Sequence, residues 1–165
     1  YRRAMDKSLK LEDDPLTSKY LAQPTFVSGG GGLVSTSLDY ARFCQMLLGQ
    51  GRYEDTQLIS RKTLALMTQN HLFQGGDLTD VAVGSFSETA YEGVGFGLGF
   101  AATIDPCAAG SVSVNDYYWG GAASTIFWVD PEEDLFVIFM TQLMPSATFN
   151  FRGQIKNIIY AAITE

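Results

Sequence analysis

The sequence predicts an α+β domain in which an antiparallel sheet packs against helices. Two apolar stretches near the C-terminus, residues 122–129 and 135–141, are joined by a short turn at residues 130–134. This spacing makes them neighbouring antiparallel strands. Both stretches are apolar almost throughout, so both faces of the sheet need cover. Helical patterns before and after the strands supply candidates for that cover.

Length, composition and charge already limit the classes of protein to which the chain can belong. The 165 residues correspond to about one domain, and a hydrophobic share of 46% is ample for a packed core. The net charge of −7, without clustered Lys or Arg, argues against a nucleic-acid partner. The longest fully apolar run, residues 135–140, is far too short to span a membrane. The compartment stays open between cytoplasm and periplasm. We expect Cys44 and Cys107 to be free thiols.

The first half of the chain is expected to hold an irregular lead-in and two helices. Residues 1–28 are mixed and polar, and the four glycines at 29–32 indicate a flexible or tightly turning backbone. A phosphate loop is the weaker interpretation, because no Lys-Ser or Lys-Thr follows. A helix is predicted over residues 37–48, with Thr36 as its cap and Asp39 three residues later.

A second helix is predicted to start at Ser60 and to carry Leu64 on its inner face. His71, the single histidine, follows the end of this helix, where it is interpreted as a half-exposed residue that complements the helix dipole. A catalytic or pocket role is the alternative. Residues 73–92, rich in Gly, Ser, Thr and Asp, are expected to form a loop.

Strands are predicted at residues 95–100 and 111–119, ahead of the two apolar strands. In the first of them small and large residues alternate, which indicates that one face needs close backbone approach. A C-terminal helix capped by Asn150 is expected to cover the sheet. Its predicted inner stripe is Phe151, Ile155, Ile158, Ile159 and Ala162, with Arg152, Lys156 and Asn157 pointing outward.

The most distinctive stretch is Tyr117-Tyr118-Trp119-Gly120-Gly121-Ala122. Adjacent glycines within a strand give up packing and chain entropy, so they are usually retained where something must approach the backbone closely. We interpret this stretch as one wall of a substrate site. A core aromatic next to a β-bulge is the structural alternative for Trp119.

Several short segments resemble one known superfamily. They are residues 29–36 (GGGGLVST), 39–43 (DYARF), 58–60 (LIS), 67–71 (MTQNH), 95–99 (GFGLG), 119–122 (WGGA), 128–131 (WVDP) and 140–142 (MTQ). Each is short, but their order over residues 24–160 resembles the serine β-lactamase and penicillin-binding-protein superfamily. The likeness is closest to the family VIII carboxylesterases and class C β-lactamase-like hydrolases.

The resemblance implies the C-terminal part of a β-lactamase/transpeptidase-like fold, with chemistry that passes through a serine acyl-enzyme and needs no metal or organic cofactor. Trp119, Gly120 and Gly121 stand where β-lactamases carry Lys-Thr-Gly. The backbone N–H of Ala122 would then be an oxyanion-hole donor. Tyr117 and Tyr118 would line an acyl pocket with Trp119. Tryptophan in place of lysine favours uncharged esters over β-lactam carboxylates.

The chain departs from the family pattern in one respect, because it contains neither Ser-x-x-Lys nor Tyr-x-Asn. In the family both motifs lie upstream of the four-glycine segment. All 165 residues are therefore expected to form the C-terminal portion of one hydrolase domain, inactive by itself. Ser113, Ser124 and Ser146 are interpreted as strand or loop serines, since none has a Lys or His nearby in sequence.

The expected partners are a small-molecule ester or amide and either the missing N-terminal half or an oligomer partner that covers the incomplete sheet. Three alternatives stay open within the family: a β-lactamase, a D-amino-acid peptidase or a transacylase. A non-catalytic binding domain that kept the fold is the alternative from another class.

Overall fold

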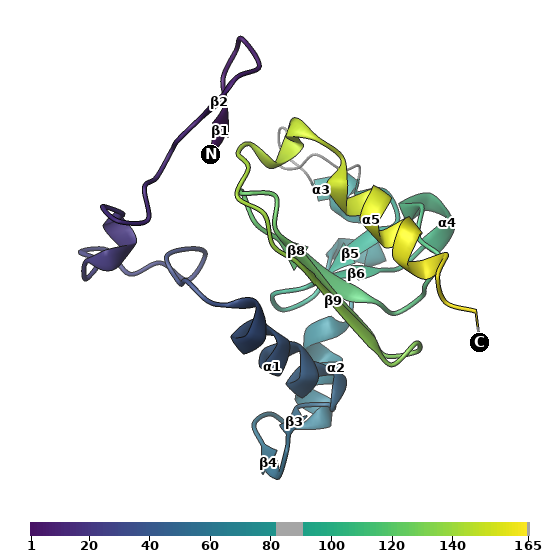
Figure 1. Ribbon diagram of the computed structural model, residues 1–165. Helices are drawn as coiled ribbons and strands as arrows, with labels where there is room; N and C mark the ends of the chain where they lie inside the picture. Colours follow the sequence, from purple (N-terminus) through teal and green to yellow (C-terminus); the bar gives the residue numbers. More distant parts are fainter. Residues whose placement is uncertain (82–90, 165) are drawn as a thin grey trace.

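A computed structural model describes residues 1–81 and 91–164 of the chain. Its centre is a five-stranded sheet in the order β5-β6-β7-β8-β9, and every neighbouring pair is antiparallel. Helix α5 covers one face of the sheet, while α1 and α2 lie on the other side (Figure 1). The predicted α+β class is therefore confirmed.

The main strands are β5 (Val94–Phe96), β6 (Ala101–Thr103), β7 (Tyr117–Gly120), β8 (Ile126–Asp130) and β9 (Leu135–Phe139). The helices are α1 (Ser37–Leu48), α2 (Arg61–Thr68), α3 (Leu78–Val81), α4 (Pro106–Ala109) and α5 (Phe151–Tyr160), with short 3-10 turns η1 (Lys19–Leu21), η2 (Phe73–Gly75) and η3 (Ser146–Thr148). Two small hairpins lie outside the main sheet: β1 (Arg2–Arg3) with β2 (Leu9–Lys10), and β3 (Arg52–Tyr53) with β4 (Thr56–Gln57).

The three long helices begin where the capping residues predict. Thr36 Oγ1 accepts the N–H of Asp39 at 3.1 Å, and Ser60 Oγ accepts the N–H of Thr63 at 3.0 Å. Asn150 caps α5 in the same way. Each side chain satisfies an amide that the first helical turn leaves without a partner, which is typically worth about 1 kcal/mol.

The main core lies between the sheet and the helix pair α1–α2. It is built from aromatic and aliphatic side chains of β6, β7 and β8 and from the inner faces of the two helices. Its buried members are Cys44, Met46, Leu47, Leu64, Phe100, Ala102, Tyr117, Phe127 and Val129. This packing fixes the face of β7 that carries Tyr117, so the opposite face is turned towards α5.

Helix α5 presents only part of the predicted face, because Phe151, Ile155 and Ile159 are half-buried as expected but the rest of the pattern differs. Arg152 and Lys156, expected to point outward, are turned towards the sheet, whereas Ile158 is 70% exposed and Ala162 is also exposed. Asn157 is exposed as expected. The apolar spacing was an incomplete guide because buried carboxylates lie beneath α5 and draw Lys156 and Tyr160 inward as well.

Two buried carboxylates interact with the polar residues of α5. Asp116 is fully buried and forms an ion pair with Lys156, whose side chain is 14% exposed. Asp130, also fully buried, accepts hydrogen bonds from the hydroxyls of Ser113 and Tyr160, the latter at 2.5 Å. Burial, together with the bond to Asp130, raises the pKa of Tyr160 above its ordinary value, so this phenol remains a donor at neutral pH.

Several strands are shorter than predicted. The strand expected at residues 122–129 starts only at Ile126, because residues 121–125 form a turn, and the strand expected at 135–141 ends at Phe139. The strand expected at 111–119 starts at Tyr117. Asn115 has a φ of 63°, which interrupts extended backbone just before it.

The structure also differs from the prediction at residues 95–103 and in the loop predicted at residues 73–92. Residues 97–100 turn the chain between β5 and a separate strand, β6, which the glycine-rich pattern concealed. Within the loop predicted at 73–92, the structure has η2 and α3. The remainder of that prediction, at residues 82–90, lies outside the described residues.

One outer strand of the sheet is closed by residues that follow α2. Asn70 Oδ1 accepts the N–H of Phe96 at 3.1 Å, and the N–H of His71 donates to the Phe96 carbonyl at 2.8 Å. A Cβ at Gly97 would overlap the carbonyl oxygen of Met67. The predicted close backbone approach at this strand is therefore confirmed, and the approaching group is the end of α2.

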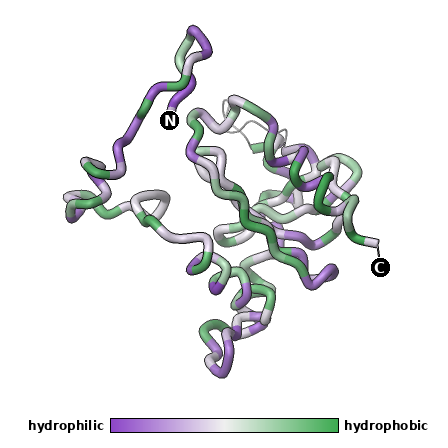
Figure 2. Tube along the Cα trace, in the orientation of Figure 1, coloured by the Kyte–Doolittle hydropathy of each residue, from purple (hydrophilic) through white to green (hydrophobic). Residues whose placement is uncertain are grey.

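The other outer strand, β9, is apolar along its length, yet all five of its residues are only half-buried. Figure 2 shows β8 and β9 as a continuous apolar band. The N-terminal arm meets the chain just beyond this strand, where Arg3 N–H donates to the Met144 carbonyl at 2.8 Å. The arm then leads away from the sheet, with Leu16, Phe26, Val27 and Leu33 each at least 80% exposed.

Removing one partner of the buried ion pair should destabilise the chain strongly. Lys156→Met leaves the Asp116 carboxylate buried without a counter-charge, and we expect a loss of about 3–5 kcal/mol in the free energy of unfolding. Urea denaturation would measure this loss. Lys62→Met, at an exposed position of α2, is the matched control and should change stability by less than about 0.5 kcal/mol. Equal effects of the two substitutions would contradict the assignment.

The two cysteines should differ sharply in reactivity. Cys44 is fully buried, and this burial raises the pKa of its thiol to about 12, so the reactive thiolate is scarce at pH 8. Cys107 is exposed. We expect iodoacetamide to add one group to the native chain and two groups in guanidinium, as read by intact-protein mass. Double modification of the native chain at a single rate would refute this.

Candidate functional site

The site predicted from sequence lies at the end of β7, where Trp119 and Gly120 are followed by a tight connection to β8. Gly120 pairs with Ile126 across the two strands. Gly121 N–H donates to the Thr125 carbonyl at 2.9 Å, and Ser124 N–H donates to the Gly121 carbonyl at 3.1 Å. The two glycines therefore mark the end of a strand and the start of a turn, rather than the interior of a strand.

Residues 122–124 form the tip of this hairpin. Ser124 adopts a φ of 68°, as expected for a three-residue hairpin loop that closes with a left-handed residue. Its hydroxyl donates to the Leu143 carbonyl at 2.7 Å, which ties the loop to the segment after β9. Ala122 is exposed, and within the described part of the chain its N–H has no hydrogen-bond acceptor. The tip thus holds an available amide on a firmly anchored loop.

Arg152 of α5 anchors the same loop from below. Its Nη2 donates to the carbonyl oxygens of Gly121 at 2.9 Å and of Thr125 at 3.0 Å. A Cβ at Gly120 would overlap the guanidinium group. The close approach to the backbone that the sequence predicts is present, but at Gly120 it is made by Arg152 rather than by an open substrate channel.

One face of the motif borders an open hollow of about 360 Å³, which we call the glycine groove. Residues 28–31 form one side, and residues 119–121 form the other. Other residues of the lining are Leu33, Tyr40, Thr125, Ile126, Phe127 and Met140. The four-glycine segment and the Trp-Gly-Gly segment, distant in sequence, are therefore brought together.

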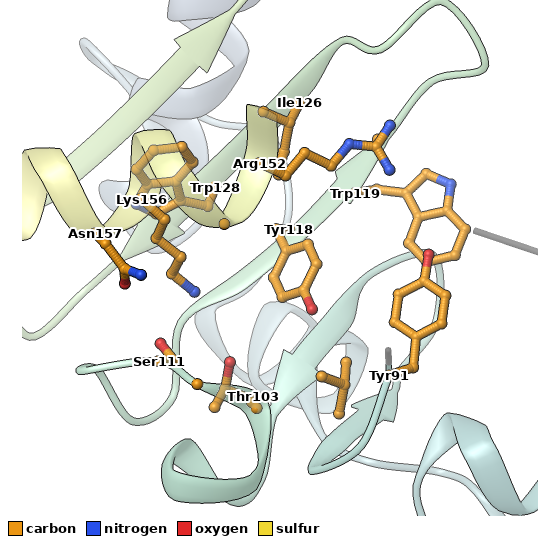
Figure 3. A pocket seen from close by; sticks show the side chains of 15 residues that line it. Tyr91, Thr103, Ser111, Tyr118, Trp119, Ile126, Trp128, Arg152, Lys156 and Asn157 are labelled. Atoms are coloured by element: carbon orange, nitrogen blue, oxygen red, sulfur yellow. The ribbon is translucent and has the colours of Figure 1, made fainter. Parts of the chain in front are cut away.

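The opposite side of the motif borders a smaller space of about 80 Å³ between α5 and the sheet, which we call the helix cavity (Figure 3). Tyr118 and Trp128 contribute from the sheet, and Arg152 and Lys156 contribute from α5. Burial, with the charge of Asp116 as a second cause, raises the pKa of Tyr118 above its ordinary value. Lys156 Nζ lies 5.2 Å from the centre of the Tyr118 ring.

The predicted site residues therefore separate into three positions. Gly120 and Trp119 line both hollows, Gly121 lines the glycine groove, and Tyr118 lines the helix cavity. Tyr117 lies away from both, buried in the main core at 3% exposure, and Ala122 lines neither hollow, although its neighbour Gly121 lines the glycine groove.

Trp119 is held by other aromatic side chains. Its ring stacks on Tyr91 with centroids 6.3 Å apart, and it meets Phe96 edge-on at 5.0 Å. Pairs of this geometry typically add about 0.5–1.5 kcal/mol each to the burial of the rings. The indole is therefore a fixed wall, and the bulge interpretation does not apply, because Trp119 pairs regularly with Phe127.

Two site residues were missed by sequence reasoning. Arg152 and Lys156 were placed on the outer face of α5, yet one holds the hairpin loop and the other enters the helix cavity. A signal was available, since Arg152, Lys156 and Tyr160 recur every fourth residue and form one polar stripe.

The serines, the histidine and the cysteines considered from the sequence have structural positions or contacts of their own. Ser113 and Ser124 are buried and donate hydrogen bonds to Asp130 and Leu143. Ser146 begins the turn η3. His71 lies just beyond α2, with Nε2 2.7 Å from the Leu66 carbonyl, which agrees with a helix-end role. Both cysteines are free.

No group of three or more His, Cys, Asp or Glu that could hold a metal occurs among residues 1–81 and 91–164. None of the helices within those ranges is long and apolar enough to cross a membrane.

Known proteins resemble the chain at the level of sequence and of fold. Protein Rv1367c of Mycobacterium tuberculosis (strain H37Rv) is 30% identical over 145 residues, which is 86% of this chain but 35% of that protein. Unliganded simvastatin synthase (LovD) from Aspergillus terreus, in its selenomethionyl form, aligns with a TM-score of 0.75 at 20% identity. That alignment covers 99% of this chain and 42% of LovD.

A third similar protein is EstCE1, described as a hydrolase with promiscuous acyltransferase activity. It aligns with a TM-score of 0.51 at 27% identity, over 71% of this chain and 28% of EstCE1. The chain thus spans well under half the length of each of these proteins. A family model named Beta-lactamase matches residues 2–159, nearly the whole sequence. The chain therefore belongs to the Beta-lactamase family.

Proposed function

We propose that this chain supplies the oxyanion wall and part of the acyl pocket of a serine hydrolase, whose nucleophile lies elsewhere in a longer polypeptide. The observation that carries the proposal is the exposed amide of Ala122, which has no acceptor among the described residues and stands on an anchored loop next to Gly121 of the glycine groove. Membership of a family of serine hydrolases and acyltransferases supports it.

The chemistry assigned to this wall is stabilisation of negative charge. When a serine attacks an ester or amide carbonyl, the carbonyl oxygen becomes an oxyanion, and a fixed N–H that points at it lowers the barrier. Loss of one such donor typically costs about 10²–10³ in rate. Because Arg152 and Ser124 already hold the loop, little reorganisation would be needed at the moment of reaction.

The substrate class follows from the walls of the groove. Trp119 is an apolar, uncharged wall, and Leu33 and Met140 add further apolar surface. A lysine at position 119 would attract a carboxylate, whereas tryptophan would not. We therefore assign an uncharged ester as the preferred substrate, with β-lactams and D-amino-acid peptides as less favoured members of the same reaction class.

Acyl transfer to an alcohol other than water is the second candidate. EstCE1 is described as a hydrolase with promiscuous acyltransferase activity, and LovD as a simvastatin synthase. An acyl-enzyme can be released by water or by another nucleophile, so both outcomes use the same oxyanion wall. A non-catalytic binding role would fit the absence of Ser-x-x-Lys from these 165 residues.

The missing partner is assigned to the rest of a longer polypeptide, with a second copy of the chain as the alternative. Apolar surface supports this: β9 is only half-buried, and the N-terminal arm exposes large apolar side chains. Such surface normally marks an interface. The chain also spans 35% of Rv1367c, which leaves ample sequence in that relative for the remainder of a domain.

A fluorophosphonate probe distinguishes the enzyme from the binding domain. We expect the full-length gene product to take up one probe molecule on a serine outside the 165 residues, and the isolated chain to take up none, as read by intact-protein and peptide mass spectrometry. A folded full-length product that takes up no probe would favour the binding role. Ester turnover by the isolated chain, abolished by a substitution within it, would refute the assignment.

Replacing Ala122 tests the oxyanion wall itself. Ala122→Pro removes the N–H, and this residue is the second of its β-turn, a position where proline is favoured, so the loop should survive. We expect kcat/KM of the full-length product for a neutral ester to fall about 10²–10³-fold. Ala122→Gly keeps the N–H and should change the rate by less than about tenfold. Equal rates for the two variants would exclude Ala122 as a donor.

A further inference from the structure

Residues 142–144, which follow β9 and which we call the bridging segment, contact the hairpin loop that carries Ala122. Leu143 makes two hydrogen bonds to this loop. Its carbonyl accepts the Ser124 hydroxyl at 2.7 Å, and its N–H donates to the Ala123 carbonyl at 3.1 Å. Both backbone groups of Leu143 are therefore bonded to the loop, at the residues that directly follow Ala122.

The next residue of the bridging segment, Met144, is bonded to the start of the N-terminal arm instead. Its N–H donates to the Tyr1 carbonyl at 2.8 Å, and its carbonyl accepts the N–H of Arg3 at 2.8 Å. Arg2 and Met144 thereby form a parallel β-bridge. In Figure 1 residues 1–3 and the chain after β9 lie side by side. The bridging segment thus joins the hairpin loop to residues 1–3.

Residues 1–3 are themselves held by the hairpin to which they belong. Arg2 and Arg3 pair with β2, and Arg2 forms an ion pair with Glu12 at 2.7 Å. The guanidinium of Arg3 lies 5.2 Å from the centre of the Phe149 ring. The arm therefore meets the body of the protein as an ordered hairpin, and its contact with Met144 is separated from the hairpin loop by Leu143 alone.

We propose that Ser124 and the backbone of Arg3 are positioning residues for the Ala122 amide, an inference that rests on the proposed function of this amide. A catalytic group misplaced by about 1 Å can cost about 100-fold in rate. Ser124 is 2% exposed, so water does not replace the Leu143 carbonyl as the partner of its hydroxyl without local opening. Release of Arg3 from Met144 frees the bridging segment, and the loop loses part of its support.

Hydrogen exchange tests this transmission without any activity. Arg3→Pro removes the N–H that bonds Met144, whereas Arg3→Ala keeps it, and both remove the guanidinium. In the full-length gene product, we expect the amides of Gly121 and Ser124, which are bonded within the hairpin loop, to exchange about tenfold faster in the proline variant than in the alanine variant. Equal exchange in the two variants would overturn the proposal.

A double-mutant cycle separates positioning from a general structural role. Ser124→Gly removes the hydroxyl and accepts the φ of 68° without strain. We expect kcat/KM of the full-length product for a neutral ester to fall about 10–100-fold, through kcat, with KM within about threefold of the parent. In the Ala122→Pro background the same substitution should change the rate less than about twofold, because the N–H that Ser124 positions is already gone.

The outcomes distinguish this proposal from the proposed function. If Ala122→Pro lowers the rate but Ser124→Gly does not, or if the two losses are additive, the oxyanion wall stands and the positioning role is overturned. If Ala122→Pro leaves the rate unchanged, the proposed function fails and the positioning role fails with it. Urea denaturation of each variant shows that a lower rate does not reflect a smaller folded fraction.

Discussion

The contact between α5 and the sheet is polar at its centre, and the rest of the structure depends on it. Lys156 neutralises Asp116, which would otherwise be a buried unpaired charge. Tyr160 donates to Asp130 one turn further along the helix. These bonds fix the rotation of α5 about its axis, and that rotation brings Arg152 beneath the hairpin loop.

Arg152 connects this helix to the candidate site. Its guanidinium lies against Gly120 and donates to two carbonyls, one on each side of the hairpin loop. A planar guanidinium with several donors suits this arrangement better than a lysine ammonium would. The loop that carries Ala122 is consequently held from below by Arg152 and from the side by Leu143, through Ser124. A fixed loop is the condition for an amide to stabilise charge without reorganising.

The two hollows on either side of Trp119 differ in their chemistry. The glycine groove is open and bordered by backbone and apolar side chains. The helix cavity is small and lies between α5 and the sheet, with Tyr118, Arg152 and Lys156 in its lining. β7 separates them because its side chains alternate between the two faces, as in any strand. A single strand of four residues thereby borders both hollows.

The sequence by itself determined the fold class, the starts of the three long helices and the family. Capping residues and the β8–β9 turn are local signals, so they can be recognised in the sequence without tertiary information. Tertiary structure decided the ends of the strands, the separate strand β6 and the inner face of α5. Strand ends depend on pairing with distant residues, and the face of a helix depends on what lies beneath it. Asp116 and Asp130 are 36 and 22 residues before Arg152 in sequence, and only folding brings them under α5.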